Sequence, residues 1–410
     1  MNTRTPQAVL AAVIFLAVAG CGSSPAPQAE TTGSTPSKHG EITGAAEVAE
    51  PQLHLVAIDA AGKASMLDLL NGAGTELGSV HPPLRVTSDG RFVFAASTTG
   101  VEIIDTGVWT WDHGDHSHYY RAGPALVGPV AGQGVASVAT GPLSTSGTTG
   151  FFFPTSGSAV LIDNAALGDG RISETLRLEI APHTGVIAPL GDGALVTEPD
   201  GSGTPVRLRA VTASGAELTT TACPAAAGTI ATRAGLVIGC ADGAVIARSE
   251  GANPVLEHVP YPEGSPAPAT SFSGRKGRPT VAGLGDGTGV WLLNTRQRSW
   301  DWLPTSTPVL AAAAVDDEAG HVVVVSKDGT VQVYDAKSKE QLSATAPLMP
   351  ATLADPALTG RVELTVDGER AYVSAPAEGV VFEIAYADGA RIARTLTLLT
   401  QPVHLAETGR

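Results

Sequence analysis

Short apolar runs recur along the chain from about residue 51 to its end. Each run is followed by a glycine-containing turn and a second run that closes near an acid or amide, as in residues 91–97 with 100–105 and residues 321–326 with 329–335. Alternating or continuous apolar residues bounded by such turns are typical of β-hairpins. Because no amphipathic helical pattern interrupts them, the chain is predicted to be all-β.

The hairpins repeat at a nearly regular interval. Taking the first apolar residue of each copy as an anchor gives eight copies, at Leu55, Phe92, Phe151, Ala194, Leu236, Thr280, Val322 and Ala371. The anchors are 37, 59, 43, 42, 44, 42 and 49 residues apart, and a four-stranded propeller blade takes about 40 to 50 residues. We predict a single β-propeller with eight blades, or with seven if one weak copy lies outside the ring.

The two ends of the repeated region complement each other. Residues 53–70 resemble the middle strands of a blade that lacks its innermost strand, and residues 402–406 can supply that strand. Pairing of the N- and C-terminal strands would remove the open sheet edge of a linear array. Asp-Gly pairs that begin at residues 89, 192, 242, 286, 328, 367 and 388 mark tight turns, where glycine is expected at positive φ.

The N-terminus carries an export signal. Arg4 precedes an apolar run, residues 8–19, that is too short to span a bilayer, so residues 1–20 are predicted to be a signal peptide. The sequence Val18-Ala19-Gly20-Cys21 resembles a lipobox, which predicts lipidation of Cys21, although an ordinary signal peptide is the alternative. Residues 21–50 are then a flexible tether, and residues 51–410 the propeller. We expect an exported protein, lipid-anchored on the outer face of the bacterial cytoplasmic membrane or in the periplasm.

The charge and the cysteine content limit the partners and the metal ligands that this chain can have. With 25 basic and 40 acidic side chains the formal net charge is −15, which argues against a nucleic-acid partner. After Cys21, only Cys223 and Cys240 remain. An oxidising compartment favours a disulfide between them, which would contribute about 3 kcal/mol by closing a loop. Two free thiols or a thiolate metal site are the alternatives. A thiolate metal site would need a nearby histidine or a CxxC spacing, and the sequence around these cysteines has neither.

The interval from Phe92 to Phe151 is longer than its neighbours, and the excess has an unusual composition. Residues 109–121 form an insertion that contains His113, His116 and His118. Imidazole is a preferred zinc ligand, and a tetrahedral site needs three or four converging groups. His116 and His118 project to the same side of an extended segment. Asp115 is a candidate fourth ligand or an acceptor that orients an imidazole. The insertion therefore predicts a Zn²⁺ site.

One further ligand candidate lies elsewhere, and the insertion also has a simpler interpretation. His183, before the inner strand of the Ala194 copy, is predicted to lie near the same mouth of the propeller. The alternative is a solvated polar insertion that binds metal only adventitiously. The neighbouring aromatic residues either shield a metal or anchor the insertion to the rim: Trp109, Trp111, Tyr119 and Tyr120.

These motifs resemble the AztD-type zinc metallochaperones, periplasmic propellers that pass zinc to the solute-binding protein of a zinc ABC importer. The resemblance extends over most of the mature chain and rests on residues 113–120, 182–186, 223–224, 239–243, 371–374 and 402–406. It implies a zinc site at His113, His116, His118 and His183, and transfer by ligand exchange with a docked partner. In the family a His-Gly-Glu follows the first Cys-Pro, whereas this chain has Ala227-Gly228-Thr229, so a ligand is missing.

We therefore predict a monomeric zinc-binding lipoprotein that acts as a metallochaperone, not as an enzyme. Two other functions fit parts of the sequence. A zinc hydrolase also uses three histidines and a water, but no metalloprotease helix motif or nucleophile elbow is present, and no general base is evident. A propeller that serves as a protein-interaction platform without required metal is equally compatible with the fold.

Overall fold

The computed structural model describes residues 42, 44–112, 116–142, 146–251 and 253–410. Residues 40–410 form a compact unit of their own. Its regular structure is almost entirely β, and the helices of the described part are short: α1 (Asn164–Gly168), α2 (Pro350–Ala354) and α3 (Pro356–Thr359). The predicted signal peptide, Cys21 and most of the predicted tether lie outside the described residues.

Eight four-stranded antiparallel sheets make up the described part of this unit, together with one sheet of three strands. In spatial order within each sheet, the strands are β35 (His404–Thr408), β2 (His54–Ile58), β3 (Lys63–Asp68), β4 (Gly74–Ser79); β5 (Arg85–Ser88), β6 (Phe92–Ala96), β7 (Gly100–Asp105), β10 (Ala125–Ala131); β11 (Ser137–Thr140), β12 (Thr148–Phe153), β13 (Ser158–Asp163), β14 (Glu174–Glu179); β15 (Ile187–Leu190), β16 (Gly193–Pro199), β17 (Pro205–Val211), β18 (Glu217–Ala222); β19 (Ala227–Thr232), β20 (Gly235–Cys240), β21 (Gly243–Glu250), β22 (Asn253–Pro260); β23 (Ser271–Ser273), β24 (Thr280–Leu284), β25 (Gly289–Asn294), β26 (Ser299–Pro304); β27 (Val309–Ala314), β28 (His321–Ser326), β29 (Val331–Asp335), β30 (Gln341–Ala344); β31 (Leu364–Val366), β32 (Ala371–Ala375), β33 (Val380–Ala385), β34 (Arg391–Thr397); and, in the three-stranded sheet, β1 (Ala46–Val48), β9 (Ser117–Arg121), β8 (Val108–Asp112).

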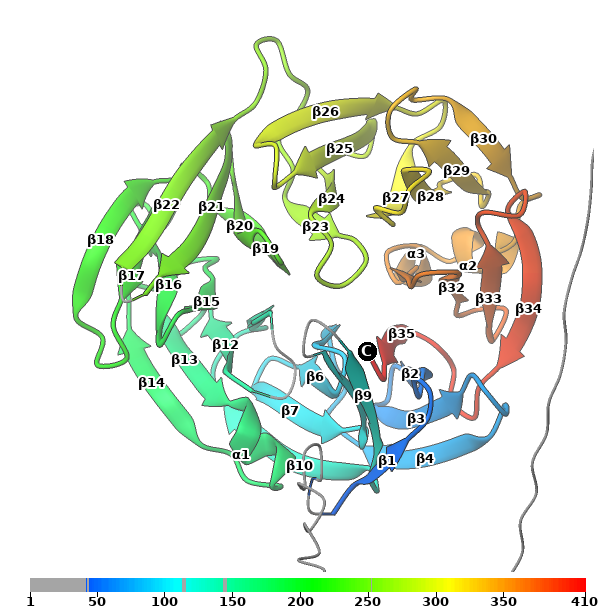
Figure 1. Ribbon diagram of the computed structural model, residues 1–410, viewed down its shortest axis with the longest axis horizontal. Coiled ribbons are helices and arrows are strands. Elements are labelled where there is room, and N and C mark those ends of the chain that lie inside the picture. Colours follow the sequence, from blue (N-terminus) through cyan, green and yellow to red (C-terminus); the bar gives the residue numbers. More distant parts are fainter. Residues whose placement is uncertain (1–41, 43, 113–115, 143–145, 252) are drawn as a thin grey trace, which may run out of the picture. The chain divides into compact units, whose positions relative to one another are not determined.

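The sheets follow the sequence repeat. Each of the eight anchors lies in the second strand of a different four-stranded sheet, and the sheets are set around a common centre (Figure 1). The all-β propeller architecture is therefore confirmed. A closed ring of eight blades remains our prediction, which the eight sheets support.

The two ends of the repeated region share one sheet, as expected. β35 is hydrogen-bonded to β2 along its whole length, from His54 opposite Thr408 to Ile58 opposite His404. This pairing joins segments about 350 residues apart and supplies β2 with the neighbour that the N-terminal hairpin lacks.

Packing between neighbouring sheets explains why many strands read as continuous apolar runs. All five residues of β6 are buried, and Phe94 on this strand meets Phe151 of β12 edge-on, with ring centroids 5.5 Å apart. On the other face of β6, Val93 and Ala95 pack with Val56 of β2. Because this sheet has a neighbour on both faces, side chains on both faces leave water, and strict alternation with polar residues is lost.

The turn glycines divide into two groups. Of the seven predicted Asp-Gly turns, five have glycine at positive φ: Gly90, Gly243, Gly287, Gly329 and Gly389. The prediction was wrong for Gly193 and Gly368. At Gly193 close approach, not φ, explains the glycine, because a Cβ there would lie 1.9 Å from the carbonyl oxygen of Val211.

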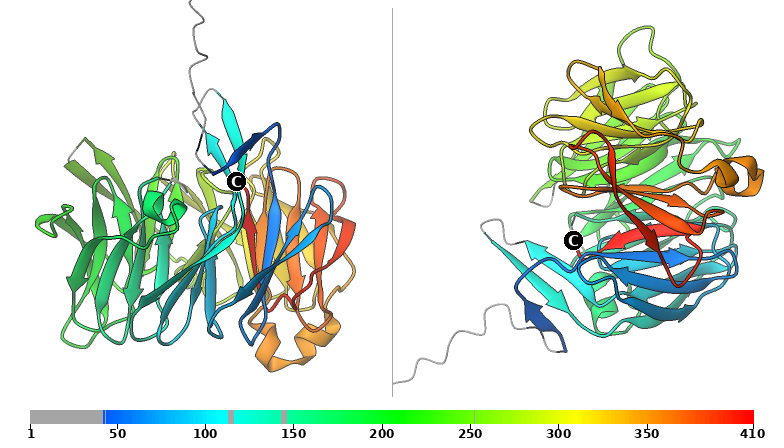
Figure 2. Two further views of the ribbon diagram at one scale, coloured as in Figure 1. Left: turned by 90° about the horizontal axis from the view of Figure 1, so that it is seen from below. Right: turned by 90° about the vertical axis from the view of Figure 1, so that its right-hand side faces the viewer.

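The histidine-bearing insertion forms a hairpin outside the four-stranded sheets. β8 and β9 lie between β7 and β10 in sequence, pair with each other, and project from one face of the ring of sheets together with β1 (Figure 2). The insertion predicted on one rim is thus present as a β-hairpin. Within the described residues, no helix combines the length and the apolar character needed to cross a membrane.

Candidate metal centre

The base of the β8–β9 hairpin is fixed by buried aromatic residues. Trp109 and Tyr120 lie opposite each other in the register and stack with ring centroids 5.0 Å apart. The guanidinium of Arg91 lies 3.8 Å from the Trp109 ring centroid and is itself held by two hydrogen bonds to Asp105, of 2.9 and 2.7 Å. Anchoring is therefore what Trp109 and Tyr120 do, whereas Trp111 near the tip is 37% exposed.

Two predicted ligands converge above this base. The Nε2 atoms of His116 and His118 are 3.0 Å apart, and their ring centroids are 4.8 Å apart. Two imidazoles bound to one tetrahedral Zn²⁺ at about 2.0–2.1 Å place their nitrogens about 3.3 Å apart. The pair therefore already has nearly the separation that a shared zinc ion requires, and both residues lie on one side of the strand as predicted.

The other two candidates of the insertion, His113 and Asp115, lie outside the described residues. Across the described segments, no cluster of three or more histidine, cysteine or carboxylate side chains is arranged to hold a metal ion. The described part of the hairpin thus supplies two nitrogens, and any complete site needs further ligands.

A residue that sequence reasoning missed contacts this pair. Glu47 lies on β1, which adds to the edge of β9, and its Oε1 is 2.5 Å from Nδ1 of His118. Burial in the first place, and the charge of Glu47 in the second, raise the pKa of the neighbouring Tyr120. Glu47 falls within the predicted flexible tether, because a strand of three residues leaves no periodic signal in the sequence.

His183 has a different environment from the hairpin pair. It is buried against Phe152, its Nδ1 lies 2.7 Å from the carbonyl oxygen of Ala181, and its Nε2 lies 2.8 Å from Oγ1 of Thr197. Burial lowers the pKa of His183. Both ring nitrogens are thus engaged by the chain, so coordination by His183 would require it to give up the Thr197 contact.

The two remaining cysteines form the predicted disulfide. Cys223 is bonded to Cys240 with a Cα–Cα distance of 5.0 Å. The bond ties the segment that follows β18 to the end of β20 in the next sheet. The thiols are therefore not available as metal ligands.

The segment that departs from the family motif begins the inner strand β19. Gly228 has φ +72°, and the pairing with β20 shifts register between Ala227 and Thr229. A Cβ at Gly228 would lie 2.6 Å from the carbonyl oxygen of Thr270. Steric crowding by Thr270 therefore explains the glycine at this position. Ala227 and Thr229 provide no imidazole or carboxylate.

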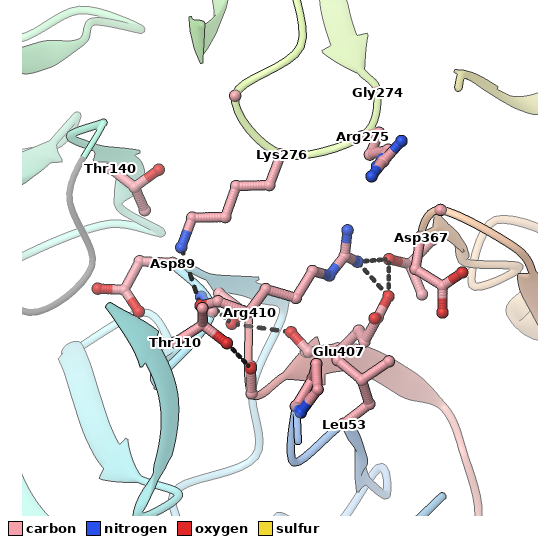
Figure 3. Close-up of a pocket in the computed structure, with 18 of the residues that line it drawn as sticks. Leu53, Asp89, Thr110, Thr140, Gly274, Arg275, Lys276, Asp367, Glu407 and Arg410 are labelled. Carbon is pink, nitrogen blue, oxygen red and sulfur yellow. Dashed lines mark hydrogen bonds and ion pairs between the residues drawn. The ribbon is translucent and has the colours of Figure 1, made fainter. Parts of the chain in front are cut away.

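A cavity of about 1350 Å³ lies at the centre of the sheets, beside the hairpin. Lys276 Nζ donates to the main-chain oxygen of Arg410 over 3.2 Å, and the Thr110 hydroxyl donates to the carbonyl oxygen of Gly409 over 2.7 Å (Figure 3). Burial raises the pKa of Asp89 to about 6 and that of Glu407 to about 7. The buried acids lie beside cations in a charge network.

The described part of the hairpin borders the central cavity. Ser117 and Tyr119 of β9 line the cavity, and so does Trp111 of β8, which lies opposite His118 in the register. The ring centroids of Trp111 and His118 are 6.0 Å apart.

Comparison with known proteins identifies what this arrangement is similar to. No family model matches the chain. A curated protein of Citrobacter koseri named zinc chaperone AztD is 27% identical over 220 residues, 50% of this chain and 50% of that protein. The chain resembles AztD. The resemblance expected from the sequence motifs is thereby confirmed, over about half the length of the relative.

The solved structures of AztD support the fold over a longer span. The crystal structure of Citrobacter koseri AztD matches with a TM-score of 0.75 at 21% identity and covers 88% of this chain and 98% of that chain. The structure of apo AztD from the same organism matches equally well, at 20% identity. The fold of this chain is thus similar to that of AztD over 88% of its length.

Proposed function

We propose that this protein is an extracytoplasmic zinc-binding lipoprotein that passes zinc to the solute-binding protein of an ABC importer. The observation that carries the proposal is the convergence of His116 and His118, whose Nε2 atoms are 3.0 Å apart on a projecting hairpin. The resemblance to a zinc chaperone supports it. Zinc is the cargo of such a protein, to be held and released rather than used in a reaction.

The proposed ligands are the histidines of the insertion, His113, His116 and His118, with Asp115 as a further ligand or orienting acceptor. His183 is proposed as an additional ligand that would exchange its Thr197 contact for the metal. Neutral imidazole binds zinc and other borderline cations, including Cu²⁺, so selectivity would come from geometry and metal supply.

A competitive zinc titration tests the site. The parent is compared with the double variant His116→Ala/His118→Ala and with a matched control, His81→Ala/His258→Ala, which removes two histidines outside the hairpin. We expect tight, stoichiometric binding in the parent and the control and its loss in the hairpin variant. Equal binding by all three folded proteins would exclude these ligands and leave an interaction platform without required metal.

Transfer is tested with a zinc-free solute-binding protein of a zinc importer. Zinc-loaded protein is mixed with this acceptor or with a small chelator of similar affinity, and the transfer rate is followed as the acceptor concentration increases. A rate that rises with acceptor concentration and exceeds release to the chelator indicates direct exchange. A rate equal to spontaneous dissociation would contradict the chaperone role.

The anchor and the oligomeric state are also proposals. Replacing Cys21 by serine should move the protein from the membrane fraction to the soluble fraction if Cys21 is lipidated. We propose a monomer, which light scattering of the soluble form tests directly.

A further inference from the structure

The last residues of the predicted tether form a strand on the metal-binding hairpin. β1 pairs with β9 in antiparallel register, with Ala46 opposite Arg121, Glu47 opposite Tyr120 and Val48 opposite Tyr119. It is the outer strand of the sheet β1-β9-β8, and Ala46 and Glu47 are exposed. A three-residue edge strand with exposed side chains is an element of low local stability.

The carboxylate of Glu47 contacts the His118 ring through the nitrogen that does not face His116. Its Oε1 lies 2.5 Å from His118 Nδ1, while Nε2 of the same ring faces His116 at 3.0 Å. The His118 side chain is only 10% exposed, whereas that of Glu47 is 48% exposed. One ring nitrogen is thus directed to a carboxylate on β1 and the other to the point where zinc is proposed to bind.

This arrangement determines which tautomer His118 adopts. An ionised carboxylate can only accept a hydrogen bond, so Nδ1 of His118 carries the proton and Nε2 presents its lone pair. Carboxylates that accept from a metal-binding histidine orient the ring and increase its basicity. The geometry of Glu47 is that of such an orienting group.

We infer that Glu47 is a positioning residue of the zinc site, and that β1 is a strap whose docking on β9 and the binding of zinc are coupled. The inference rests on the proposed function. Coupling is reciprocal, so docking of β1 strengthens zinc binding by the same factor by which zinc stabilises docked β1. A partner that displaces β1 from the edge of β9 would lower the affinity for zinc, so that zinc could be released to that partner.

The decisive variant is Glu47→Gln, with Glu50→Gln as its matched control. Both remove one carboxylate from the same segment, but Glu50 lies beyond β1. Loss of an orienting carboxylate typically costs 10- to 100-fold in metal affinity. We expect zinc affinity to fall about 10-fold in Glu47→Gln and to stay at the parent value in Glu50→Gln, with recovery in Glu47→Asp if the shorter carboxylate still reaches Nδ1.

Two further measurements report on positioning rather than on overall folding. In ¹⁵N-histidine spectra of the zinc-free protein, His118 should be protonated at Nδ1 in the parent and should populate both tautomers in Glu47→Gln. In hydrogen exchange, zinc should slow exchange of the amides of residues 46–48 about 10-fold in the parent, and this protection should be lost in Glu47→Gln.

The outcomes separate this inference from the proposed function. Suppose that zinc binds through His116 and His118, that zinc does not change amide hydrogen exchange at residues 46–48, and that Glu47→Gln binds zinc as tightly as the parent. The coupling of β1 to zinc binding is then excluded, while the zinc site itself is retained. If Glu47→Gln loses zinc as completely as the double histidine variant, Glu47 is a ligand and the positioning role is overturned. If the double histidine variant keeps its zinc, the proposed function itself fails.

Discussion

In two regions of this protein, the ring nitrogens of the histidines contact different kinds of groups. On the hairpin, the Nε2 atoms of His116 and His118 face each other at 3.0 Å. In the blades, His183 contacts Ala181 and Thr197 through its two nitrogens, and Nε2 of His404 lies 3.1 Å from the carbonyl oxygen of Pro83. The contrast lies in the partners of the ring nitrogens: in the blades they contact uncharged oxygen atoms of the chain, whereas on the hairpin Nε2 of one imidazole faces Nε2 of another.

The largest effect is expected on the hairpin side of this comparison. His118→Ala removes one of the proposed ligands together with the contact to Glu47, and loss of about 4 kcal/mol of binding free energy corresponds to about 1000-fold weaker zinc binding. A competition titration against a chromophoric chelator measures it. His258→Ala is the control. Parent-like zinc affinity in His118→Ala would show that the hairpin histidines do not differ from those of the blades in zinc binding.

His183→Ala should act mainly on stability. The substitution empties a buried position and leaves the partners at Ala181 and Thr197 without the imidazole, which should lower the free energy of unfolding by about 3 kcal/mol. Urea denaturation of the zinc-free protein gives this value. If stability is retained while zinc affinity falls as in His118→Ala, His183 belongs with the hairpin ligands.

His404 should make the blades sensitive to acid. Burial, reinforced by the charge of Arg361, lowers the pKa of His404 to about 4. The folded protein therefore keeps this imidazole neutral while the unfolded chain takes up a proton near pH 6.5, so the contribution is complete above pH 6.5 and is lost as the pH falls toward 4. Between pH 7.5 and 5 the loss should be about 2 kcal/mol.

The variant His404→Gln isolates this contribution. Urea denaturation at pH 7.5 and pH 5 should show a smaller loss of stability on acidification than in the parent, and the difference should be about 2 kcal/mol. His258→Gln, at a partly exposed histidine, should lose as much as the parent. Identical acid sensitivity in all three proteins would show that His404 is not the titrating group.

The smallest effect is expected for an exposed histidine of the blades. His81 has a side chain that is 70% exposed and pairs with Glu102 at 3.0 Å. Because such surface pairs contribute little, His81→Ala should change the free energy of unfolding by less than about 0.5 kcal/mol. Zinc affinity should also stay at the parent value, and a clear decrease in it would extend the metal site beyond the hairpin.

Much of the fold was predictable because its signals are local. A strand that packs on both faces needs a continuous apolar run, and a tight return needs a small residue, so each copy of the repeat could be recognised without knowledge of its neighbours. The failures at Gly193 and Gly368 arise from contacts with other segments. A Cβ at 193 would meet the carbonyl oxygen of Val211 on the adjacent strand β17, and a Cβ at 368 would lie 3.1 Å from the guanidinium of Arg275.

The candidate site was predictable only in part. The spacing of His116 and His118 placed both rings on one side of an extended segment, and that is how they lie. The environment of His183 was not predictable, because Thr197, which contacts its Nε2, is a neighbour only once β15 and β16 pair. Glu47 was missed because its partner is 71 residues away in the sequence.

The sequence by itself thus determined the all-β class, the repeat, the shared sheet of the two ends, the disulfide and the insertion with its histidines. These follow from side-chain period, turn chemistry and composition, which act over a few residues at a time. Only the tertiary structure decided which groups each histidine contacts, that the inserted residues form a hairpin beside the central cavity, and that β1 brings Glu47 to His118. Such contacts depend on the register between distant strands, and a local pattern carries no information about that register.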